Sequence, residues 1–485
     1  MKKTILLKII ALLSVMTVLT SCDLTGGRLP GGTSETEESP TETEAQTEKV
    51  PHEVTDETVY RYGGDPDYPV LADAYLSVLP KRNFNGATFI VSSPDVTFLD
   101  ENEVKYVSKT VKERNDAVEE KYNVKLVSSK VDPVTMAEEA KKAMLAGMYY
   151  TNIMCVPFEK VGAFAAEGIL MNLRSMPLLD LSQPYFNKTS VAALSAGYNI
   201  YGAAGEAVPV YDLPCIIFNR PLAQTVTDTD LYDLAEAGEF TWEKFYSIAQ
   251  EASALDGYCG AAITGGETID YVHRSFGEAY INSGELQVPA TAIERFSMDW
   301  SATYIRRMLK MGADEGITKD TAVSAFNEGS VLFTIGKVGE LDLYRNTNVL
   351  VGILPLPKRN ADWGYRSEVG GDALIMTVPS KSTDSEMNSL IFSALNAASY
   401  GYITETAASY LHATTLPDNR SADMLEIISR SAVYEFSTAF LETVPSLAEL
   451  REVIRGIIET GDFSRYDDAI YKANYDLGMT FRLSN

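Results

Sequence analysis

Short apolar runs alternate with charged, amphipathic stretches along the central part of the chain. The first run, Ala87 to Ser92, lies between an Asn-Gly pair and a Ser-Ser-Pro turn, and Thr110 to Tyr122 then has the spacing of an amphipathic helix. A strand at Asn123 to Ser128 and a helix at Val134 to Met148, ending at Gly147, repeat this order. Strands that alternate with helices predict parallel sheets covered by helices on both faces.

The alternation continues through most of the chain. An apolar run at Asn152 to Val156 precedes a helix at Val161 to Ala166. Further strands are predicted at Cys215 to Asn219, Ala261 to Thr264, Val331 to Ile335, Val349 to Leu354 and Asp372 to Val378. After Asp384 the pattern is helical almost to the end. The sequence shows no repeat of about 20 to 50 residues, which argues against a solenoid. The patterned region has roughly 425 residues, which is more than one hydrophobic core normally accommodates, so at least two lobes are expected.

The first 21 residues have the pattern of an export signal. Lys2, Lys3 and Lys8 precede a short apolar stretch, and small residues lead into Cys22. The apolar stretch is about half the length that a membrane-spanning helix needs. The Leu-Thr-Ser-Cys pattern resembles the bacterial lipobox, which implies cleavage after residue 21 and lipidation of Cys22 at the outer face of a membrane. An ordinary signal peptide with a chance cysteine is the alternative.

Residues 22–58 are predicted to form a disordered acidic tether. The segment is rich in Gly, Thr, Ser, Pro and Glu and has almost no large apolar residue, so it cannot bury enough surface to offset the entropy of ordering it. Its glutamates repel one another and favour an extended spacer.

The charge of the chain excludes one class of partner. Residues 22–485 contain 38 Lys and Arg against 67 Asp and Glu, a net charge of −29. Nucleic-acid binding needs clustered basic residues, and no basic stripe is present. Cys155, Cys215 and Cys259 stand among apolar or small residues, so buried free thiols are favoured, although one disulfide remains an alternative.

The usual signatures of catalysis are missing. The sequence has no G-x-S-x-G, H-E-x-x-H or G-x-G-x-x-G motif, and Gly336-Lys337 lacks the first glycine of a phosphate loop. The three histidines, His52, His273 and His412, are far apart, which argues against a zinc site or a catalytic triad. We therefore expect no catalytic residue, metal or cofactor. Paired carboxylates of a glycoside hydrolase remain an alternative, because sequence does not reveal their spacing in space.

Seven segments in register, over roughly Phe84 to Tyr434, resemble extracellular solute-binding proteins of family 1, the maltose-binding type, and especially clostridial lipoproteins of this group. These segments are Ala143–Gly147 with Asn152–Pro157 and Phe164–Leu173, Tyr201-Gly202 with Ile216–Arg220, Phe240–Glu243, Phe326–Phe333, Gly352–Lys358, Gly370-Gly371 and Ser421–Ile428. Each segment alone is weak, and their common order carries the resemblance.

The resemblance implies an α/β fold of the periplasmic-binding-protein-like type II. Two α/β lobes are joined by a multi-strand hinge, with lobe 1 at 82–205, a return to it at 348–372, and lobe 2 at 213–345. The mainly helical region 380–485 is expected to pack on lobe 2 and the hinge. The implied protein is a monomeric lipoprotein of an ABC importer that binds a carbohydrate, expected to be an oligosaccharide, and delivers it to the permease subunits. A glycan-binding or sensor lipoprotein without a transporter is the alternative.

The resemblance also implies binding residues in lobe 1 and at the hinge. Sugar recognition needs flat aromatic faces and polar groups that satisfy hydroxyls. A gapless alignment places Glu159-Lys160 on a hydroxyl-binding acid and base, and Phe158 is expected to supply a missing aromatic face. Counting back from Phe218–Arg220 places Asp212 on a sugar-binding acid, with Tyr211 beside it.

In lobe 2, Glu267 and Tyr271 approximately match another acid and aromatic of the family. The family's stacking tryptophan is absent near Gly336, where this chain has Glu340, so Trp363 and Tyr365 are expected to provide stacking instead. Core packing or a solvated loop is the alternative for these aromatics. Trp242 is assigned to structure, because Thr241 before it is a suitable N-cap of a helix.

Overall fold

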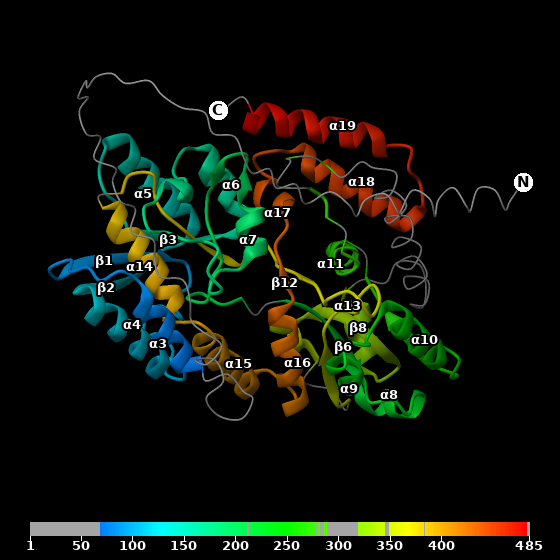
Figure 1. Ribbon diagram of the computed structural model, residues 1–485. Helices are drawn as coiled ribbons and strands as arrows, with labels where there is room; N and C mark the ends of the chain where they lie inside the picture. Colours follow the sequence, from blue (N-terminus) through cyan, green and yellow to red (C-terminus); the bar gives the residue numbers. More distant parts are fainter. Residues whose placement is uncertain are drawn as a thin grey trace, which may run out of the picture. The chain divides into compact units, whose positions relative to one another are not determined.

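The computed structural model describes residues 68–210, 213–264, 266–277, 279–281, 286, 288, 319–344, 349–382 and 384–482 (Figure 1). The predicted signal peptide, the tether and Cys22 lie outside the described residues, as do Tyr211 and Asp212. None of the described helices is long and apolar enough to cross a membrane. Two four-stranded sheets organise the described chain into two lobes.

The sheet of lobe 1 has the order β11-β3-β1-β2. Its strands are β1 (Ala87–Ser93), β2 (Val124–Lys130), β3 (Ile153–Pro157) and β11 (Leu374–Thr377). Strands β1, β2 and β3 are parallel, and β11 is antiparallel to β3. The short hairpin of β4 (Ser195–Ala196) and β5 (Asn199–Ile200) follows in the chain.

Helices cover both faces of this sheet. Along β3, Ile153 and Cys155 belong to the same core cluster as residues of helices α3, α4 and α14, whereas Met154 and Val156 belong to the cluster that includes α5 and α6. Alternate residues of a strand point to opposite faces, so the sheet is buried on both sides as predicted. The helices of this lobe are α3 (Tyr68–Val78), α4 (Ser108–Tyr122), α5 (Pro133–Ala146), α6 (Val161–Ala166), α7 (Lys188–Ala193) and α14 (Ser385–Ala397), with short 3₁₀ turns η1 (Phe158–Lys160) and η2 (Leu173–Ser175).

The sheet of lobe 2 has the order β7-β8-β6-β9. Its strands are β6 (Pro214–Asn219), β7 (Cys259–Ala262), β8 (Val331–Lys337) and β9 (Val351–Leu354). The helices are α8 (Arg220–Val226), α9 (Leu231–Glu236), α10 (Trp242–Ser253), α11 (Glu267–Ser275) and α13 (Lys319–Asn327), with the 3₁₀ segment η3 (Val338–Tyr344) after β8.

The sheets are mixed, not wholly parallel as expected. Strand β6 is antiparallel to both β8 and β9, and β11 is antiparallel to β3. Both exceptions follow a crossing between the lobes. Pro214 at the start of β6 pairs with Lys337 at the end of β8, and Leu374 at the start of β11 pairs with Pro157 at the end of β3. A strand that enters a sheet at the carboxyl end of its neighbour must run against that neighbour.

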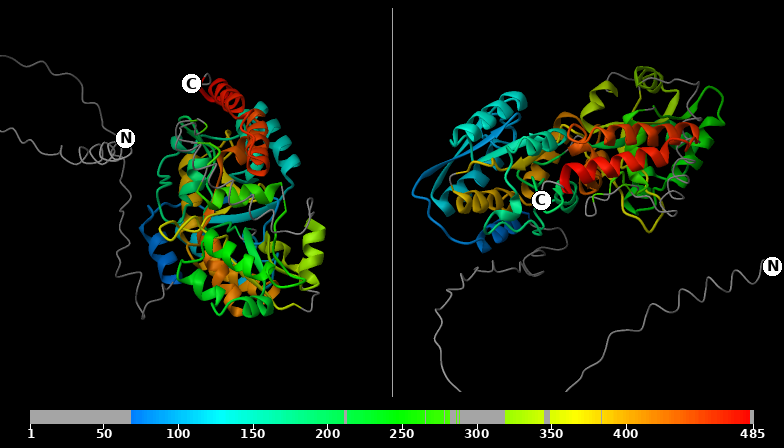
Figure 2. Two further views of the ribbon diagram at one scale, coloured as in Figure 1. Left: turned by 90° about the vertical axis from the view of Figure 1, so that its right-hand side faces the viewer. Right: turned by 90° about the horizontal axis from the view of Figure 1, so that it is seen from above.

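The last part of the chain packs against elements of both lobes. Strand β10 (Ser367–Glu368) pairs in parallel with β12 (Ala432–Val433). The helices here are α15 (Tyr402–Thr414), α16 (Asn419–Arg430), α17 (Phe436–Phe440), α18 (Ser446–Thr460) and α19 (Tyr466–Leu477), followed by the π-helical turn η4 (Gly478–Arg482). Helices α18 and α19 run side by side (Figure 2).

Two expected boundaries and the expected packing of the helical region need correction. Lobe 1 already begins at α3, before residue 82. The chain does not return to it at 348, because β9 still pairs with β6 of lobe 2, and only β11 joins the first sheet. The helical region is also divided. Helices α14 and α15 pack on α3 and α4 of lobe 1, α16 packs on β9, and α17 packs on η1, α6 and α7.

Helix signals in the sequence are confirmed at several ends. Gly147 caps α5 with φ of 65°, a left-handed conformation that glycine adopts without strain. The Thr241 side chain accepts a hydrogen bond from the Lys244 N–H at the start of α10. Trp242 is fully buried and donates its indole N–H to Ser275 Oγ at 2.8 Å, so its assignment to structure is confirmed.

The cysteines form no disulfide in the part of the chain that the structure describes. Cys155 and Cys215 are buried, as expected for structural thiols, whereas Cys259 is partly exposed. Burial raises the pKa of Cys155 to about 12, which keeps its thiol protonated and unreactive.

Candidate functional site

Three charged residues lie at or just beyond the carboxyl ends of strands from the two sheets. Glu159 lies two residues after the end of β3, Lys337 is the last residue of β8, and Glu267 opens helix α11 after β7. In open α/β sheets, ligands bind outside the carboxyl ends of the strands, where loops and helix N-termini converge. These three positions therefore define the part of the molecule in which to look for a binding site.

Lys337 contacts several of the predicted site residues of lobe 2. Its Nζ lies 3.5 Å from Glu267 Oε1 and 5.8 Å from the centroid of the Tyr271 ring. Its backbone N–H donates to Glu340 Oε2 at 3.4 Å. The Lys337 side chain is 19% exposed and that of Glu267 is 58% exposed. The structure thus brings Glu267, Tyr271 and Glu340 around one lysine, and we call these four residues the Lys337 cluster.

A glycine pair connects this cluster to lobe 1. A Cβ at Gly371 would lie 2.8 Å from Glu159 Oε2, and a Cβ at Gly370 would lie 3.8 Å from Lys337 Nζ. The Glu159 N–H also donates to the Gly371 carbonyl at 3.0 Å. The segment that crosses from lobe 2 to lobe 1 therefore passes between Glu159 and Lys337, and Gly371 has no room for a side chain unless Glu159 moves.

Glu159 and Lys160 form the predicted acid-base pair. Lys160 Nζ lies 3.4 Å from Glu159 Oε1 and 2.5 Å from Glu442 Oε1, just after α17. The hydrogen bond to Glu442 raises the pKa of Lys160. Both side chains of the pair are partly exposed, so their polar groups are accessible to a ligand.

Asp212 and Tyr211 remain predictions, because they lie outside the described residues. The next described residue is Leu213. The Leu213 carbonyl accepts a hydrogen bond from Val338 N–H at 3.1 Å, next to Lys337. The described chain thus resumes beside the Lys337 cluster.

Phe158 and Tyr365 are placed in packing contacts. Phe158 is fully buried and meets the Tyr434 ring edge-on, with centroids 5.1 Å apart. The Tyr365 hydroxyl donates to the Ala235 carbonyl at 2.9 Å, and Lys358 Nζ lies 5.3 Å from its ring centroid. Burial raises the pKa of Tyr365 to about 12. In this conformation neither ring is grouped with the Lys337 cluster.

Trp363 is surrounded by basic groups. The guanidinium carbons of Arg359 and Arg366 lie 5.2 and 5.5 Å from its ring centroid. A Cβ at Gly277, which follows α11, would lie 2.1 Å from the Trp363 ring, so the indole packs directly on this glycine. Trp363 therefore packs near the last residues of α11, whereas Glu267 is its first residue. A role of Trp363 in stacking on a solute stays a prediction.

A separate hollow lies at the opposite end of the lobe 2 strands. It has a volume of about 540 Å³ and is lined in part by Tyr258 and Cys259 before and in β7 and by Ser330 and Val331 at the start of β8. It is therefore distinct from the Lys337 cluster, which lies at the carboxyl ends of the same strands.

Lys337 itself was not predicted as a site residue. The sequence pointed to Gly336-Lys337 only as a failed phosphate loop. A lysine that directly ends a buried apolar strand, as Lys337 ends β8, is the signal that could have identified it.

Comparisons with known proteins show the fold. No family model and no curated protein sequence matches the chain. Among solved structures, the maltose-binding periplasmic protein MalE from Listeria monocytogenes in complex with maltose is 12% identical, with a TM-score of 0.53 over 81% of this chain and 99% of that one. A cyclo/maltodextrin-binding protein complexed with maltotetraose is 14% identical, with a TM-score of 0.51 over 81% and 97%.

A family 1 extracellular solute-binding protein from Bifidobacterium longum subsp. infantis is similar to the same degree, with 14% identity and a TM-score of 0.51 over 81% of this chain and all of that one. These neighbours are binding proteins, and each matches almost over its full length. The chain therefore has the type II periplasmic-binding-protein fold of the family 1, maltose-binding type of extracellular solute-binding proteins.

Proposed function

We propose that this protein is an exported solute-binding lipoprotein of an ABC importer, and that it binds a carbohydrate between its lobes. The observation that carries the proposal is the placement of Glu159 of lobe 1 and the Lys337 cluster of lobe 2 on either side of Gly370-Gly371. A solute held between these groups would contact both lobes and favour their closure.

The chemistry of the cluster suits a polyhydroxylated solute. Glu159 and Glu267 offer partly exposed carboxylate oxygens that accept hydrogen bonds from hydroxyl groups, and Lys337 offers donors. Hydrogen bonds to charged groups contribute about 1.5 to 3 kcal/mol each. Similar solved structures hold maltose and maltotetraose, which supports an oligosaccharide as the solute.

The proposal includes the residues that lie outside the described chain. Asp212 would add a carboxylate and Tyr211 an aromatic face where the chain joins β6. Cys22 would carry the lipid that retains the protein near the permease subunits. Two or more acyl chains are needed for stable attachment, since one chain holds a protein only marginally.

A thermal-shift screen with mono- and oligosaccharides tests the binding function. A saccharide at 100 times its Kd adds about 2.7 kcal/mol to the free energy of unfolding, which is readily detected as a higher Tm. Chromatography of the same mixtures checks for hydrolysis. Binding without product supports a transport receptor, whereas turnover of an oligosaccharide would identify a glycoside hydrolase instead.

Export and anchoring need their own test. Labelling cells with a radioactive or clickable fatty acid should mark the full-length protein and not the Cys22→Ala variant, which should be released into the surrounding fluid. An unlabelled wild-type protein would contradict the lipoprotein assignment and leave sugar binding untouched.

A further inference from the structure

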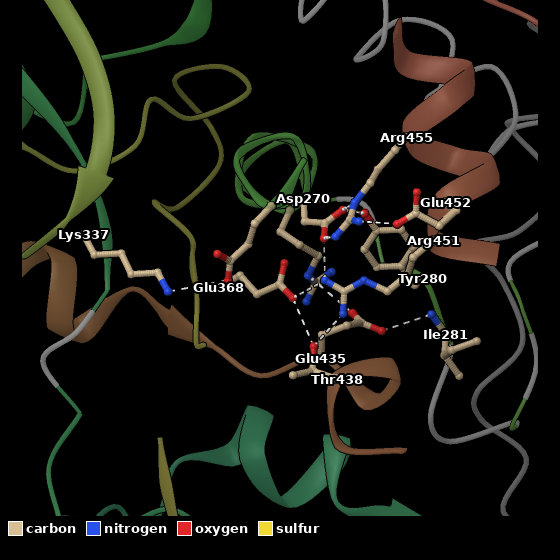
Figure 3. Close-up of polar contacts among 12 residues, drawn as sticks. Asp270, Tyr280, Ile281, Lys337, Glu368, Glu435, Thr438, Arg451, Glu452 and Arg455 are labelled. Carbon is tan, nitrogen blue, oxygen red and sulfur yellow. Dashed lines mark hydrogen bonds and ion pairs between the residues drawn. The ribbon is translucent and has the colours of Figure 1, made fainter. Parts of the chain in front are cut away.

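A buried network of charges lies beside the proposed solute site (Figure 3). At its centre is Asp270 of α11, which is fully buried. Its carboxylate accepts hydrogen bonds from Arg451 Nη2 at 2.7 Å, from Arg455 Nε at 3.0 Å and from the Tyr280 hydroxyl at 2.5 Å. A second contact from Arg455 Nη2 completes the shell. Every oxygen of this carboxylate is thus already engaged within the protein.

Arg451 of α18 connects Asp270 to two other segments. Its Nη1 donates to Thr438 Oγ1 of α17 at 2.8 Å, and its Nη2 also lies 3.4 Å from Glu368 Oε1 of β10. Its guanidinium carbon lies 4.9 Å from the centroid of the Tyr280 ring. Figure 3 shows these side chains converging on the guanidinium from α11, β10, α17 and α18.

These segments belong to different parts of the fold. Helix α11 is part of lobe 2, α17 packs on η1, α6 and α7 of lobe 1, and β10 ends two residues before Gly370. A second buried ion pair also connects α11 with the α17 region. Arg274 of α11 lies 3.4 Å from Glu435, which precedes α17. Arg451 therefore joins lobe 2, the hinge segment and the part of the C-terminal region that rests on lobe 1.

Helix α11 relates this network to the Lys337 cluster. Glu267 and Tyr271, one helical turn apart, contact Lys337, whereas Asp270 between them is held by Arg451 and Arg455. Residues on one short helix cannot shift independently of each other. The position of Glu267 relative to Lys337 and Gly370 therefore depends on the anchoring of Asp270.

From this geometry we infer that Arg451 is a positioning residue of the proposed solute site: it fixes α11 against the hinge strand and α17, and it sets solute affinity without touching the solute. The inference rests on the proposed function for its effect on affinity. The guanidinium suits this role because it spans Asp270, Glu368 and Thr438 together, which the single ammonium group of a lysine cannot do.

Hydrogen exchange of the wild-type protein and the Arg451→Lys variant tests the anchoring without any ligand. We expect amides of α11 to exchange about tenfold faster in the variant, because local opening of the helix costs less. Thr438→Val, which removes one contact of Arg451 and keeps the side-chain shape, should act in the same direction and more weakly. The Thr438→Val variant also provides the hydrogen-exchange test if Arg451→Lys does not fold.

Arg220→Lys is the matched control. Arg220 forms an ion pair with Asp418 at 3.0 Å and lies just after the end of β6 that is remote from Lys337. It should leave the exchange of α11 unchanged, even if the protein becomes less stable. Unchanged exchange of α11 in both Arg451→Lys and Thr438→Val would overturn the inference.

Calorimetric titration with maltotriose and with the best saccharide of the screen tests the link to affinity. Arg451→Lys should weaken binding about tenfold, within the range reached by residues that act on a site from outside it, and Arg220→Lys should not. Faster exchange of α11 with unchanged affinity would contradict the positioning role. If no saccharide binds the wild-type protein, the proposed function fails, whereas faster exchange would still support the anchoring by Arg451.

Discussion

Helix α11 carries two carboxylates within one turn, one exposed to solvent and one buried. The Glu267 side chain is 58% exposed and forms an ion pair with Lys337 at 3.5 Å, whereas Asp270 is fully buried and is bound by two arginines and a tyrosine. The first carboxylate can exchange its partner for a solute hydroxyl at little cost. The second cannot, because its removal would leave the buried Arg451 without its nearest carboxylate. Exposure and the number of partners thus separate a charge that can bind from a charge that holds the fold.

The largest effect is expected when the buried charge is removed. Asp270→Asn keeps the shape of the side chain and leaves Arg451 and Arg455 without their shared carboxylate. Loss of one partner of a buried ion pair costs about 3 to 5 kcal/mol. Urea denaturation should show a decrease of this size in the free energy of unfolding. A loss below about 1 kcal/mol would remove the distinction between the two carboxylates.

His273, on the same helix, is a buried titratable residue whose contribution to stability depends on pH. It is fully buried, its ring nitrogens have no hydrogen-bond partner among the described residues, and burial together with Arg274 lowers its pKa to about 3. Asp270 raises this pKa and Arg451 lowers it further. Since the pKa is about 6.5 in the unfolded chain, the stability contributed by neutral His273 is present above that pH and is lost as the pH falls.

His273→Leu removes this response. Between pH 7 and pH 5, the variant should lose about 2 kcal/mol less stability than the wild-type protein. Glu368 titrates in the opposite sense, because burial raises its pKa to about 7 and stability falls as the pH rises from about 4.5. That contribution is shared by both proteins and cancels in the difference. Parallel stability curves for the two proteins would contradict a neutral buried His273.

The smallest effect on stability is expected at the exposed carboxylate. Glu267→Gln removes only a solvated ion pair with Lys337, and such pairs contribute about 0 to 1 kcal/mol. Urea denaturation of Glu267→Gln and of Asp270→Asn, three residues away on the same helix, compares the two losses in the free energy of unfolding. A loss comparable to that of Asp270→Asn would place Glu267 among the residues that hold the fold.

Local signals in the sequence predicted most elements of the fold. The apolar runs became β1, β3 and β8, and Gly147 and Thr241 mark helix ends as expected. The predicted parallel direction was wrong for β6 and β11, because strand direction depends on where the chain crosses between the lobes. Among the candidate site residues, the structure groups Glu267, Tyr271 and Glu340 around Lys337 and brings Glu159 close to Gly371.

The buried network could not be predicted from local pattern. Asp270 and Arg451 are 181 residues apart, and each alone has the appearance of an ordinary charged position on an amphipathic helix. Periodicity identifies which face of a helix is buried, but it does not identify the partner of a buried charge. The same limit applies to Lys337, whose neighbours come from α11, η3 and the hinge segment.

Calorimetric titration of the best saccharide into matched variants shows whether the acids around Lys337 and the hinge bind a sugar. Glu267→Gln and Asp212→Ala should each weaken binding more than tenfold, a loss of about 1.4 kcal/mol or more, while circular dichroism shows an unchanged fold. Asp233→Asn is the control, since Asp233 is also an exposed acid, paired with Arg420 at 2.7 Å on α9. Equal affinity in the wild-type protein and both site variants would contradict the account.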